Sequence, residues 1–214
     1  MIFFLFNGTP WGKYKFKQDV KKYLEQTFEQ EMVIVSGVNY GFKIDSYSIS
    51  VSPKDNRAIR FAVWQNKERL GDNYLINFWS YQFNTEINDY LKEIYPNHEA
   101  KGKIIIDREP ENYQNNIGMV NSPPNYDEVK DQLRNGTIIS LEIDSKGNDS
   151  IDYEKLFTVM KHLKQGGYSF ELLRIRYLLS NDVEKKVWLD YSDIIKIKDK
   201  QELIELFINN STPN

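Results

Sequence analysis

The feature that most constrains the fold of this chain is a stripe of large apolar residues at helical spacing between positions 75 and 94. The stripe consists of Leu75, Phe78, Trp79, Phe83, Ile87, Tyr90, Leu91 and Ile94. Residues three or four apart lie on one face of a helix, so the pattern predicts a long helix that must bury one side. Asp72 is placed to cap the start of this helix, and Pro96 ends it.

The residues before this helix predict a further helix and three strands. Apolar residues recur at helical spacing from Tyr14 to Phe28, with Lys, Gln and Glu between them. Runs rich in β-branched and aromatic residues follow at positions 32–44, 46–53 and 58–65. Gly37 and Gly41 predict a bulge or break in the first run. One antiparallel sheet covered on one face by both helices would bury these stripes, which predicts an α+β domain over residues 14–96.

A change in composition after Pro96 predicts a linker and then a second domain. Residues 97–124 are rich in Pro, Asn and charge, and a short strand is expected at Ile104–Ile106. The pattern then predicts a short helix at 125–133, a strand at 137–144, a helix at 152–164, strands at 168–180 and 185–191, and a last helix containing Leu203 and Phe207. The fold class is therefore α+β with two small domains, the second over 125–214, each an antiparallel sheet with helices packed on one face.

Composition limits the function classes that fit this chain. Its 28 basic and 31 acidic residues are interspersed and give a formal net charge of −3. A protein that binds nucleic acid is expected to carry a basic face, so nucleic acid is not an expected partner. The chain has no cysteine, which excludes disulfides, thiolate zinc sites and a cysteine nucleophile.

The start of the chain combines a short apolar run with signals found at a membrane boundary. Residues 2–6 are apolar but too few to cross a bilayer, which needs about 20 such residues. Turn-forming residues follow, and then Trp11, Lys13 and Lys15, an order typical of the exit from a hydrophobic anchor. Residues 1–13 are therefore expected to be the remnant of a membrane anchor, with these three side chains as membrane-interface or partner contacts. The alternative is that residues 3–6 form a buried strand or a tail that folds back.

Three motifs in the first half occur in the same order in a known group of proteins. They are GTPWG at positions 8–12 after a hydrophobic segment, PKDN at 53–56, and DNY at 72–74 followed by Trp79. Together they resemble small exported or membrane-anchored proteins of Bacillus-type Firmicutes, a group without an assigned activity. The resemblance covers residues 3–95, and it implies a location and a fold but no chemistry.

Residues that often carry chemistry do not form a recognisable site in this sequence. His98 and His162 lack metal-ligand spacing and are expected to be solvated. Residues 144–155 depart from the EF-hand pattern and are expected to form a capped strand-to-helix turn. The carboxylate pairs Glu86 with Asp89 and Asp190 with Asp193 are expected on solvated faces, and Trp64 and Trp79 in the core. No catalytic, cofactor-binding or metal-ligating residue is therefore predicted, and no cofactor.

Two functions of different class fit these observations. The first is a non-catalytic, membrane-tethered binding or accessory protein outside the cytoplasm, with an unknown protein or cell-wall partner and a missing or truncated N-terminal membrane segment. The second is a soluble cytosolic interaction module, such as an inhibitor or a toxin-immunity protein. Membrane anchoring outside the cytoplasm is the expected location, with the cytoplasm as the alternative.

Overall fold

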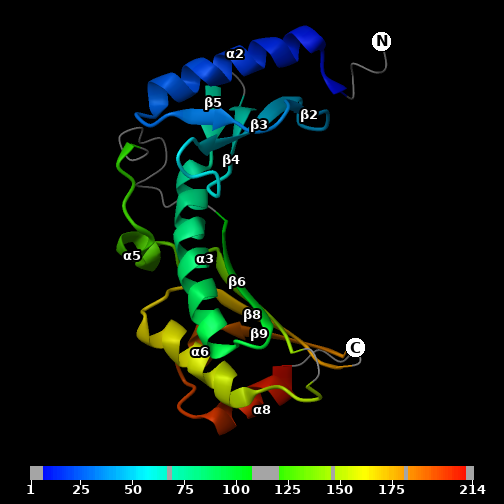
Figure 1. The fold of residues 1–214 in the computed structure, drawn as a ribbon, viewed down its shortest axis with the longest axis vertical. Coiled ribbons are helices and arrows are strands. Elements are labelled where there is room, and N and C mark those ends of the chain that lie inside the picture. The colour runs from blue at the N-terminus through cyan, green and yellow to red at the C-terminus, as the bar shows by residue number, and fades with distance from the viewer. Residues whose placement is uncertain (1–6, 67–68, 108–120, 146–147, 181–182, 211–214) are drawn as a thin grey trace. The chain divides into compact units, whose positions relative to one another are not determined.

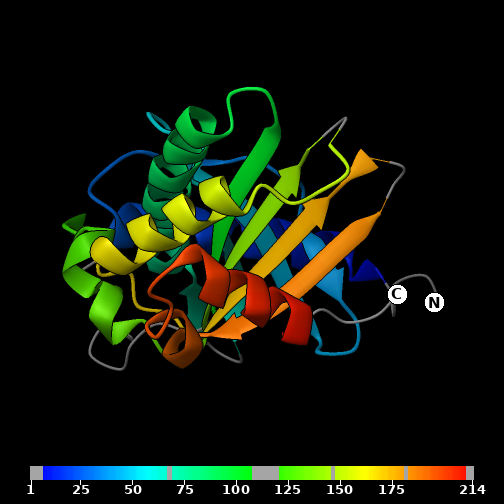
Figure 2. The same cartoon turned by 90° about the horizontal axis from the view of Figure 1, so that it is seen from below.

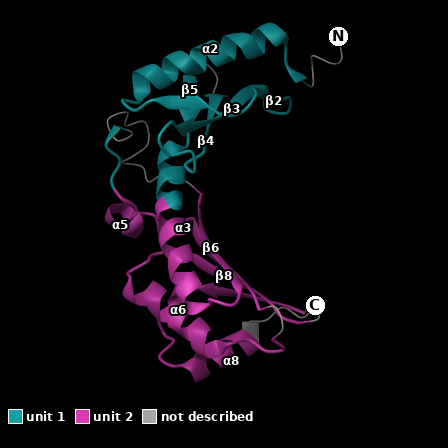
Figure 3. Cartoon of the chain, viewed as in Figure 1, with its two compact units in different colours: residues 1–81, 111–124 teal, residues 82–110, 125–214 magenta. Residues whose placement is uncertain are grey.

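The computed structural model describes residues 7–66, 69–107, 121–145, 148–180 and 183–210. The chain divides into two compact units, coloured separately in Figure 3. Unit 1 comprises residues 1–81 and 111–124, and unit 2 comprises 82–110 and 125–214. The predicted fold class, α+β with helices packed on sheets, is confirmed.

Unit 1 is a five-stranded antiparallel sheet with a helix lying along one face, labelled in Figure 1. The elements are α2 (Pro10–Thr27), β1 (Met32–Ile34), β2 (Asn39–Gly41), β3 (Ser46–Pro53), β4 (Phe61–Asn66) and β5 (Arg69–Asp72), followed by the start of α3 (Tyr74–Ile94). The strands follow the order β1, β3, β4, β5, and β2 also pairs with β3. Phe16, Val20 and Leu24 are the buried face of α2, and Ile49, Val51 and Val63 are buried in the sheet.

Helix α2 begins at Pro10, inside the segment that the sequence predicted as an anchor remnant. The Thr9 hydroxyl accepts a hydrogen bond from the Gly12 backbone N–H at 3.0 Å, and Pro10 fits the first helical position because its fixed φ is already helical. Residues 10–13 are therefore helical. Residues 1–6, including the apolar run, lie outside the described residues.

The first predicted strand is divided into β1 and β2, which lie one after the other along β3. Ile34 pairs with Val51, and Asn39 pairs with Ser48. The four residues 35–38 therefore lie opposite only two residues of β3, Ile49 and Ser50. The predicted break around Gly37 is therefore confirmed. Strand β5 was not predicted, because its four residues include Gly71 and show no alternation of polar and apolar side chains.

Asp72 caps α3, as the sequence predicted. One carboxylate oxygen accepts a hydrogen bond from the Tyr74 backbone N–H at 2.7 Å, and the other accepts one from the Tyr23 hydroxyl of α2. Burial raises the pKa of the Asp72 carboxyl above its ordinary value, and these two hydrogen bonds oppose the shift. The cap therefore joins α2 to α3 through a carboxylate that is costly to ionise.

Replacement of Asp72 by Asn is expected to remove a pH-dependent loss of stability. Because the pKa is raised on folding, the folded chain holds this proton more tightly than the unfolded chain. Stability from this group therefore falls as the pH rises from 3.8, the ordinary value, through the raised pKa. Urea unfolding from about pH 4 to about pH 7 should show the free energy of unfolding of the wild type, minus that of D72N, decreasing with pH. A difference that increases with pH would contradict this account.

Unit 2 contains a four-stranded sheet with its helices on one face, as Figure 2 shows for α6 and α8. The elements are the rest of α3, β6 (Glu99–Ile106), α5 (Tyr126–Val129), the 3-10 turn η1 (Lys130–Gln132), β7 (Thr137–Asp144), α6 (Tyr153–Gln165), β8 (Leu172–Leu178), β9 (Glu184–Asp190), α7 (Tyr191–Ile194) and α8 (Lys200–Asn210). The strands lie in chain order from β6 to β9. Alternate residues of each strand are buried beneath the helices, for example Leu173, Ile175 and Tyr177 of β8.

The second sheet is mixed, so the prediction of an antiparallel sheet is wrong for one pair of strands. β7 and β8 are parallel, with Leu141 opposite Ile175, and the other two pairs are antiparallel. The reason is the helix between them: α6 returns the chain to the end of the sheet where β7 began. The predicted cap of α6 is confirmed, because the Asp152 carboxylate accepts a hydrogen bond from the Lys155 N–H at 3.1 Å.

The predicted linker at 97–124 contains the edge strand of the second sheet. β6 pairs with β7 along its whole length, and alternate residues of the strand, such as Gly102 and Ile104, are buried. The sequence predicted only the last part of this strand, Ile104–Ile106, because small residues occupy the inner side of its earlier part. A Cβ at Gly102 would lie 2.8 Å from the Ile87 side chain of α3, so only glycine allows the strand to approach the helix.

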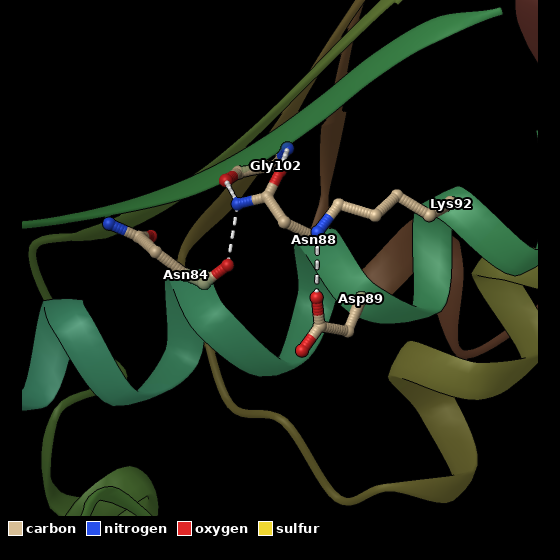
Figure 4. A network of polar contacts seen from close by, with 5 residues as sticks. All are labelled: Asn84, Asn88, Asp89, Lys92 and Gly102. Atoms are coloured by element: carbon tan, nitrogen blue, oxygen red, sulfur yellow. Dashed lines mark hydrogen bonds and ion pairs between the residues drawn. The ribbon is translucent and has the colours of Figure 1, made fainter.

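Asparagine side chains of α3 cover the outer edge of β6, and Figure 4 shows the contact of Asn88 with Gly102. The Asn88 amide accepts a hydrogen bond from the Gly102 N–H at 2.9 Å and donates one to the Gly102 carbonyl at 2.8 Å. Asn84 accepts a hydrogen bond from the Ile104 N–H at 2.8 Å. These contacts satisfy backbone groups that no strand of the sheet pairs, and they leave β6 a poor template for a further strand.

Replacement of Asn88 by Ala should destabilise the protein, because it leaves the N–H and C=O of Gly102 without protein partners. A loss of about 1–3 kcal/mol in the free energy of unfolding is expected. Lys92→Ala is the matched control on the same helix, because it breaks only the exposed pair with Asp89 and should cost less than about 0.5 kcal/mol. Equal effects of both variants in urea unfolding would contradict the covering role of Asn88.

Candidate functional site

Unit 1 exposes apolar and basic side chains on the early turns of α2 and in the β2–β3 turn. This aromatic–basic surface consists of Trp11, Lys13, Tyr14 and Lys15 on α2, and Phe42, Lys43 and Ile44 in the turn between β2 and β3. Trp11 and Tyr14 are each 68% exposed, Phe42 is 50% exposed and Ile44 is 76% exposed. Large apolar side chains exposed in one region often mark a contact surface, whereas single ones are ordinary.

Two tyrosines hold the β2–β3 turn beside the first turn of α2. The Tyr47 hydroxyl accepts a hydrogen bond from the Thr9 N–H at 3.2 Å, and its ring stacks on Phe16 with 5.7 Å between centroids. Tyr40 packs on Tyr47 at 5.0 Å. Gly8 has a φ of +69°, and a Cβ there would lie 2.7 Å from the Tyr47 ring. The approach of the two segments therefore depends on glycine at this position.

The turn itself is closed by a contact between its two ends. The Tyr40 hydroxyl donates a hydrogen bond to the Asp45 carboxylate at 2.6 Å, and this bond raises the pKa of the Tyr40 phenol. Asp45 has a φ of +46°, in the left-handed region that aspartate tolerates better than most residues. Phe42, Lys43 and Ile44 are therefore presented at the tip of a closed turn.

The electrostatics at the start of α2 are unusual for a helix. Acidic side chains normally occupy the first turn, because the N-terminal end of a helix carries partial positive charge. The first turn of α2 has no acidic residue, and Lys13 lies there instead, with Lys15 in the next turn. Lys43 adds a third positive charge from the neighbouring turn. The aromatic–basic surface thus combines positive charge with exposed aromatic rings, which suits a negatively charged and partly apolar surface.

All three residues singled out in the sequence lie on the aromatic–basic surface. Trp11 and Lys15 are exposed, and Lys13 is half-buried. Sequence reasoning missed Phe42 and Ile44, which it placed in a predicted strand. The signal that could have found them is the polar and glycine pattern around the turn, together with the paired tyrosines that flank it.

The aspartates and tryptophans considered in the sequence take structural roles within their units. Asp89 pairs with Lys92, and Asp193 pairs with Lys196, both on the surface. Trp79 is fully buried, as predicted, whereas Trp64 is only half-buried and lies against Gly71.

The expectation of solvated histidines is wrong for His162 and holds only in part for His98, whose Nδ1 is buried while its Nε2 lies 3.0 Å from the Asn148 amide. The His162 ring stacks on Tyr90 with 3.8 Å between centroids, and its Nε2 is buried without a hydrogen-bond partner among the described residues. Tyr168 lies beside it and donates a hydrogen bond from its hydroxyl to Glu86 of α3. Burial, and next the hydrogen bond to Glu86, raise the pKa of the Tyr168 phenol. The aromatic packing of α3 on α6 explains why His162 is not solvated.

Unit 2 also has an open cavity of about 810 Å³ at one end of its sheet. Asp107, Glu171 and Asp190 line it together with Arg134, whose guanidinium lies 4.6 Å from the centre of the Tyr191 ring. The Glu171 carboxylate accepts a hydrogen bond from the Gly136 N–H at 2.7 Å. Through this bond Glu171, the residue before β8, is joined to Gly136, the residue before β7.

Within the residues that the structure describes, no group of three or more His, Cys, Asp or Glu side chains is arranged to hold a metal ion. In the same residues, every helix is too short or too polar to span a bilayer.

Comparisons with known proteins do not assign a family to this chain. No protein-family model matches it, and no curated protein matches it significantly. The chain is similar to the crystal structure of a DUF5037 family protein from Ruminococcus gnavus, with 13% sequence identity and a TM-score of 0.43. The match covers 83% of this chain and 95% of that one. A likeness at this level assigns neither a family nor a function.

The exposed aromatic residues of α2 should be dispensable for folding, whereas the tyrosine beneath them should not. The double variant Trp11→Ala with Tyr14→Ala is expected to change the free energy of unfolding by less than about 0.5 kcal/mol, because both rings are largely exposed. Tyr47→Ala should cost about 2 kcal/mol or more, since it removes the stacking on Phe16 and Tyr40. Urea unfolding measures both, and a large loss for the double variant would make those rings structural.

Proposed function

We propose that this chain is a non-catalytic binding or accessory protein, tethered to a membrane outside the cytoplasm. In this proposal, unit 1 lies against the lipid headgroups through the aromatic–basic surface. The observation that carries the proposal is the exposure of Trp11, Tyr14, Phe42 and Ile44, with three lysines among them, on the early turns of α2 and in the β2–β3 turn. Tryptophan and tyrosine favour the boundary between water and lipid, and lysines favour anionic headgroups.

The sequence order supports the same orientation. The apolar residues 2–6 are separated from Gly8 only by Asn7, so a hydrophobic segment there would place the start of α2 at the membrane. The resemblance to exported or anchored proteins, carried by residues 3–95, agrees with this location. The surface ion pairs of Asp89 and Asp193 fit a protein without a catalytic role for these carboxylates.

The membrane contact is tested with vesicles and purified protein of residues 1–214. Sedimentation with vesicles containing about one third phosphatidylglycerol should recover the wild type, and vesicles of phosphatidylcholine alone should recover less. Trp11→Ala with Tyr14→Ala should weaken binding about tenfold or more, because two rings no longer enter the interface. Trp188→Ala is the matched control, since it removes an exposed tryptophan of unit 2. Equal binding by all variants would contradict the proposed surface.

The location is tested separately. Because the sequence has no cysteine, an introduced cysteine is its only thiol that a maleimide can label. The exposed residue Gln165 is replaced by Cys, and intact cells of the native host are treated with a membrane-impermeant maleimide. Labelling in intact cells is expected, with lysed cells as the control for reactivity. Labelling only after lysis would contradict the proposal and favour the soluble cytosolic interaction module.

A further inference from the structure

The outer edge of β1 has no partner strand among the described residues of unit 1. The hydrogen bonds to β3 show which way its backbone groups point. Val35 donates from its N–H to the Ser50 carbonyl at 2.9 Å, and Lys54 donates to the Glu31 carbonyl at 2.8 Å. Bonded pairs alternate along an antiparallel ladder, so every second residue from Glu31 onwards faces β3.

The residues between them, Met32 and Ile34, therefore direct their backbone N–H and C=O away from the sheet. Their side chains lie on the same face as the buried side chain of Val51, because Ile34 is directly opposite Val51 in the ladder. This is the face that α2 covers. All residues of β1 are only half-buried, so this apolar edge strand is accessible to solvent among the described residues.

A groove of about 1030 Å³ runs along β1 and the neighbouring side of α2. Leu24 and Phe28 line it from the helix side, and Met32 and Ile34 line it from the strand side. A groove between a helix and an open strand edge is the setting in which extended peptides add to a sheet, because the edge offers hydrogen bonds and the groove offers side-chain pockets.

The two ends of the groove carry opposite charge. Lys17 and Lys21 line the part beside the earlier turns of α2, and neither forms an ion pair with any described residue. Glu25 and Glu29 line the part nearer the end of the helix. An occupant with carboxylates at one end and basic or neutral groups at the other is therefore complementary to the groove.

The two edges of the second sheet are protected in ways that β1 is not. Asn84 and Asn88 bond to the outward backbone groups of β6, and β9 carries the exposed lysines Lys185 and Lys186. Both devices discourage pairing with a further strand. β1 has an apolar sequence, Met-Val-Ile, and a groove beside it instead.

We propose that this groove binds an extended segment of a partner protein, which adds to the sheet as a strand beside β1. Backbone groups of Met32 and Ile34 pair with the segment, and its apolar side chains contact Leu24 and Phe28. Acidic residues of the segment lie against Lys17 and Lys21. The inference deepens the proposed function and rests on its binding role, but it does not depend on the membrane contact.

The probe is a random decapeptide library displayed on phage, selected on the full chain. Enriched peptides are synthesised with a fluorescent label, and their affinities are measured by anisotropy. Enriched sequences should alternate apolar residues and carry carboxylates toward one end. Failure to enrich any peptide, or enrichment of sequences without acidic residues, would overturn the proposal.

Charge reversal separates the groove from the rest of α2. Lys17→Glu with Lys21→Glu should weaken peptide binding about tenfold or more. Lys15→Glu with Lys22→Glu makes the same change in net charge outside the groove and should alter peptide affinity less than about twofold. Equal losses for the two double variants would show that the peptide is attracted by non-specific charge, and this result would overturn the site. The second double variant should still weaken vesicle binding, so the two proposals fail or succeed independently.

The backbone pairing is tested with Ile34→Pro, which removes an outward N–H that β3 does not use. Proline is tolerated on the solvent side of an edge strand, so the fold should persist while peptide binding falls about tenfold or more. Hydrogen exchange of the wild type adds a readout that does not depend on a variant: the amides of Met32 and Ile34 should become protected when peptide binds. Protection elsewhere without protection at these amides would overturn strand addition. A concentration-dependent dimer that Ile34→Pro abolishes would assign the edge to a second copy of the chain instead.

Discussion

The constraint on which this structure depends is that every backbone N–H and C=O of a sheet edge needs a partner or water. In unit 2, the edge strand β6 meets this requirement through the amides of Asn84 and Asn88, and Gly102 allows the helix that carries them to come close. In unit 1, the described residues supply β1 with a partner strand only on the side that faces β3. The two sheets therefore differ in what they can accept, and the open edge is where we place partner binding.

Helix α2 connects the two proposed contacts of unit 1. Its inner face forms the core with the sheet, which fixes the direction of the helix and leaves its remaining sides available. Trp11 and Lys15, in its early turns, belong to the aromatic–basic surface, whereas Lys17 and Lys21 line the groove. One helix can thus serve a lipid surface and a peptide segment because different side chains carry each contact.

The strongest periodic patterns were sufficient to predict the main elements. The stripe that includes Trp79 and Leu91 predicted α3, and Asp72 predicted where the helix begins. Large apolar side chains at helical spacing fit few structures other than a helix with one buried face. Only the last part of β6, Ile104–Ile106, was predicted, because Gly102 presents no apolar side chain to the core. Its burial depends on the approach of α3, which is a tertiary contact. The parallel pairing of β7 and β8 was missed although a helix between two strands favours it.

The candidate site was predictable only where the chain order carries the signal. Trp11 follows turn-forming residues and precedes lysines, and this order is visible without a structure. Phe42 and Ile44 join the same surface because Tyr47 holds their turn against Thr9, a contact between residues 38 positions apart. The groove depends on which amides of β1 face outward, and this follows from the register with β3 rather than from any local pattern.

The most direct test of the central claim is amide hydrogen exchange, resolved by residue, in the free protein. The account predicts slow exchange for Gly102 and Ile104, whose amides are bonded to asparagine side chains, and fast exchange for Met32 and Ile34. Val33 and Val35, which face β3, should be slower than their two neighbours. Slow exchange of Met32 and Ile34 in the free protein would show that the edge of β1 is already covered, and it would contradict the account.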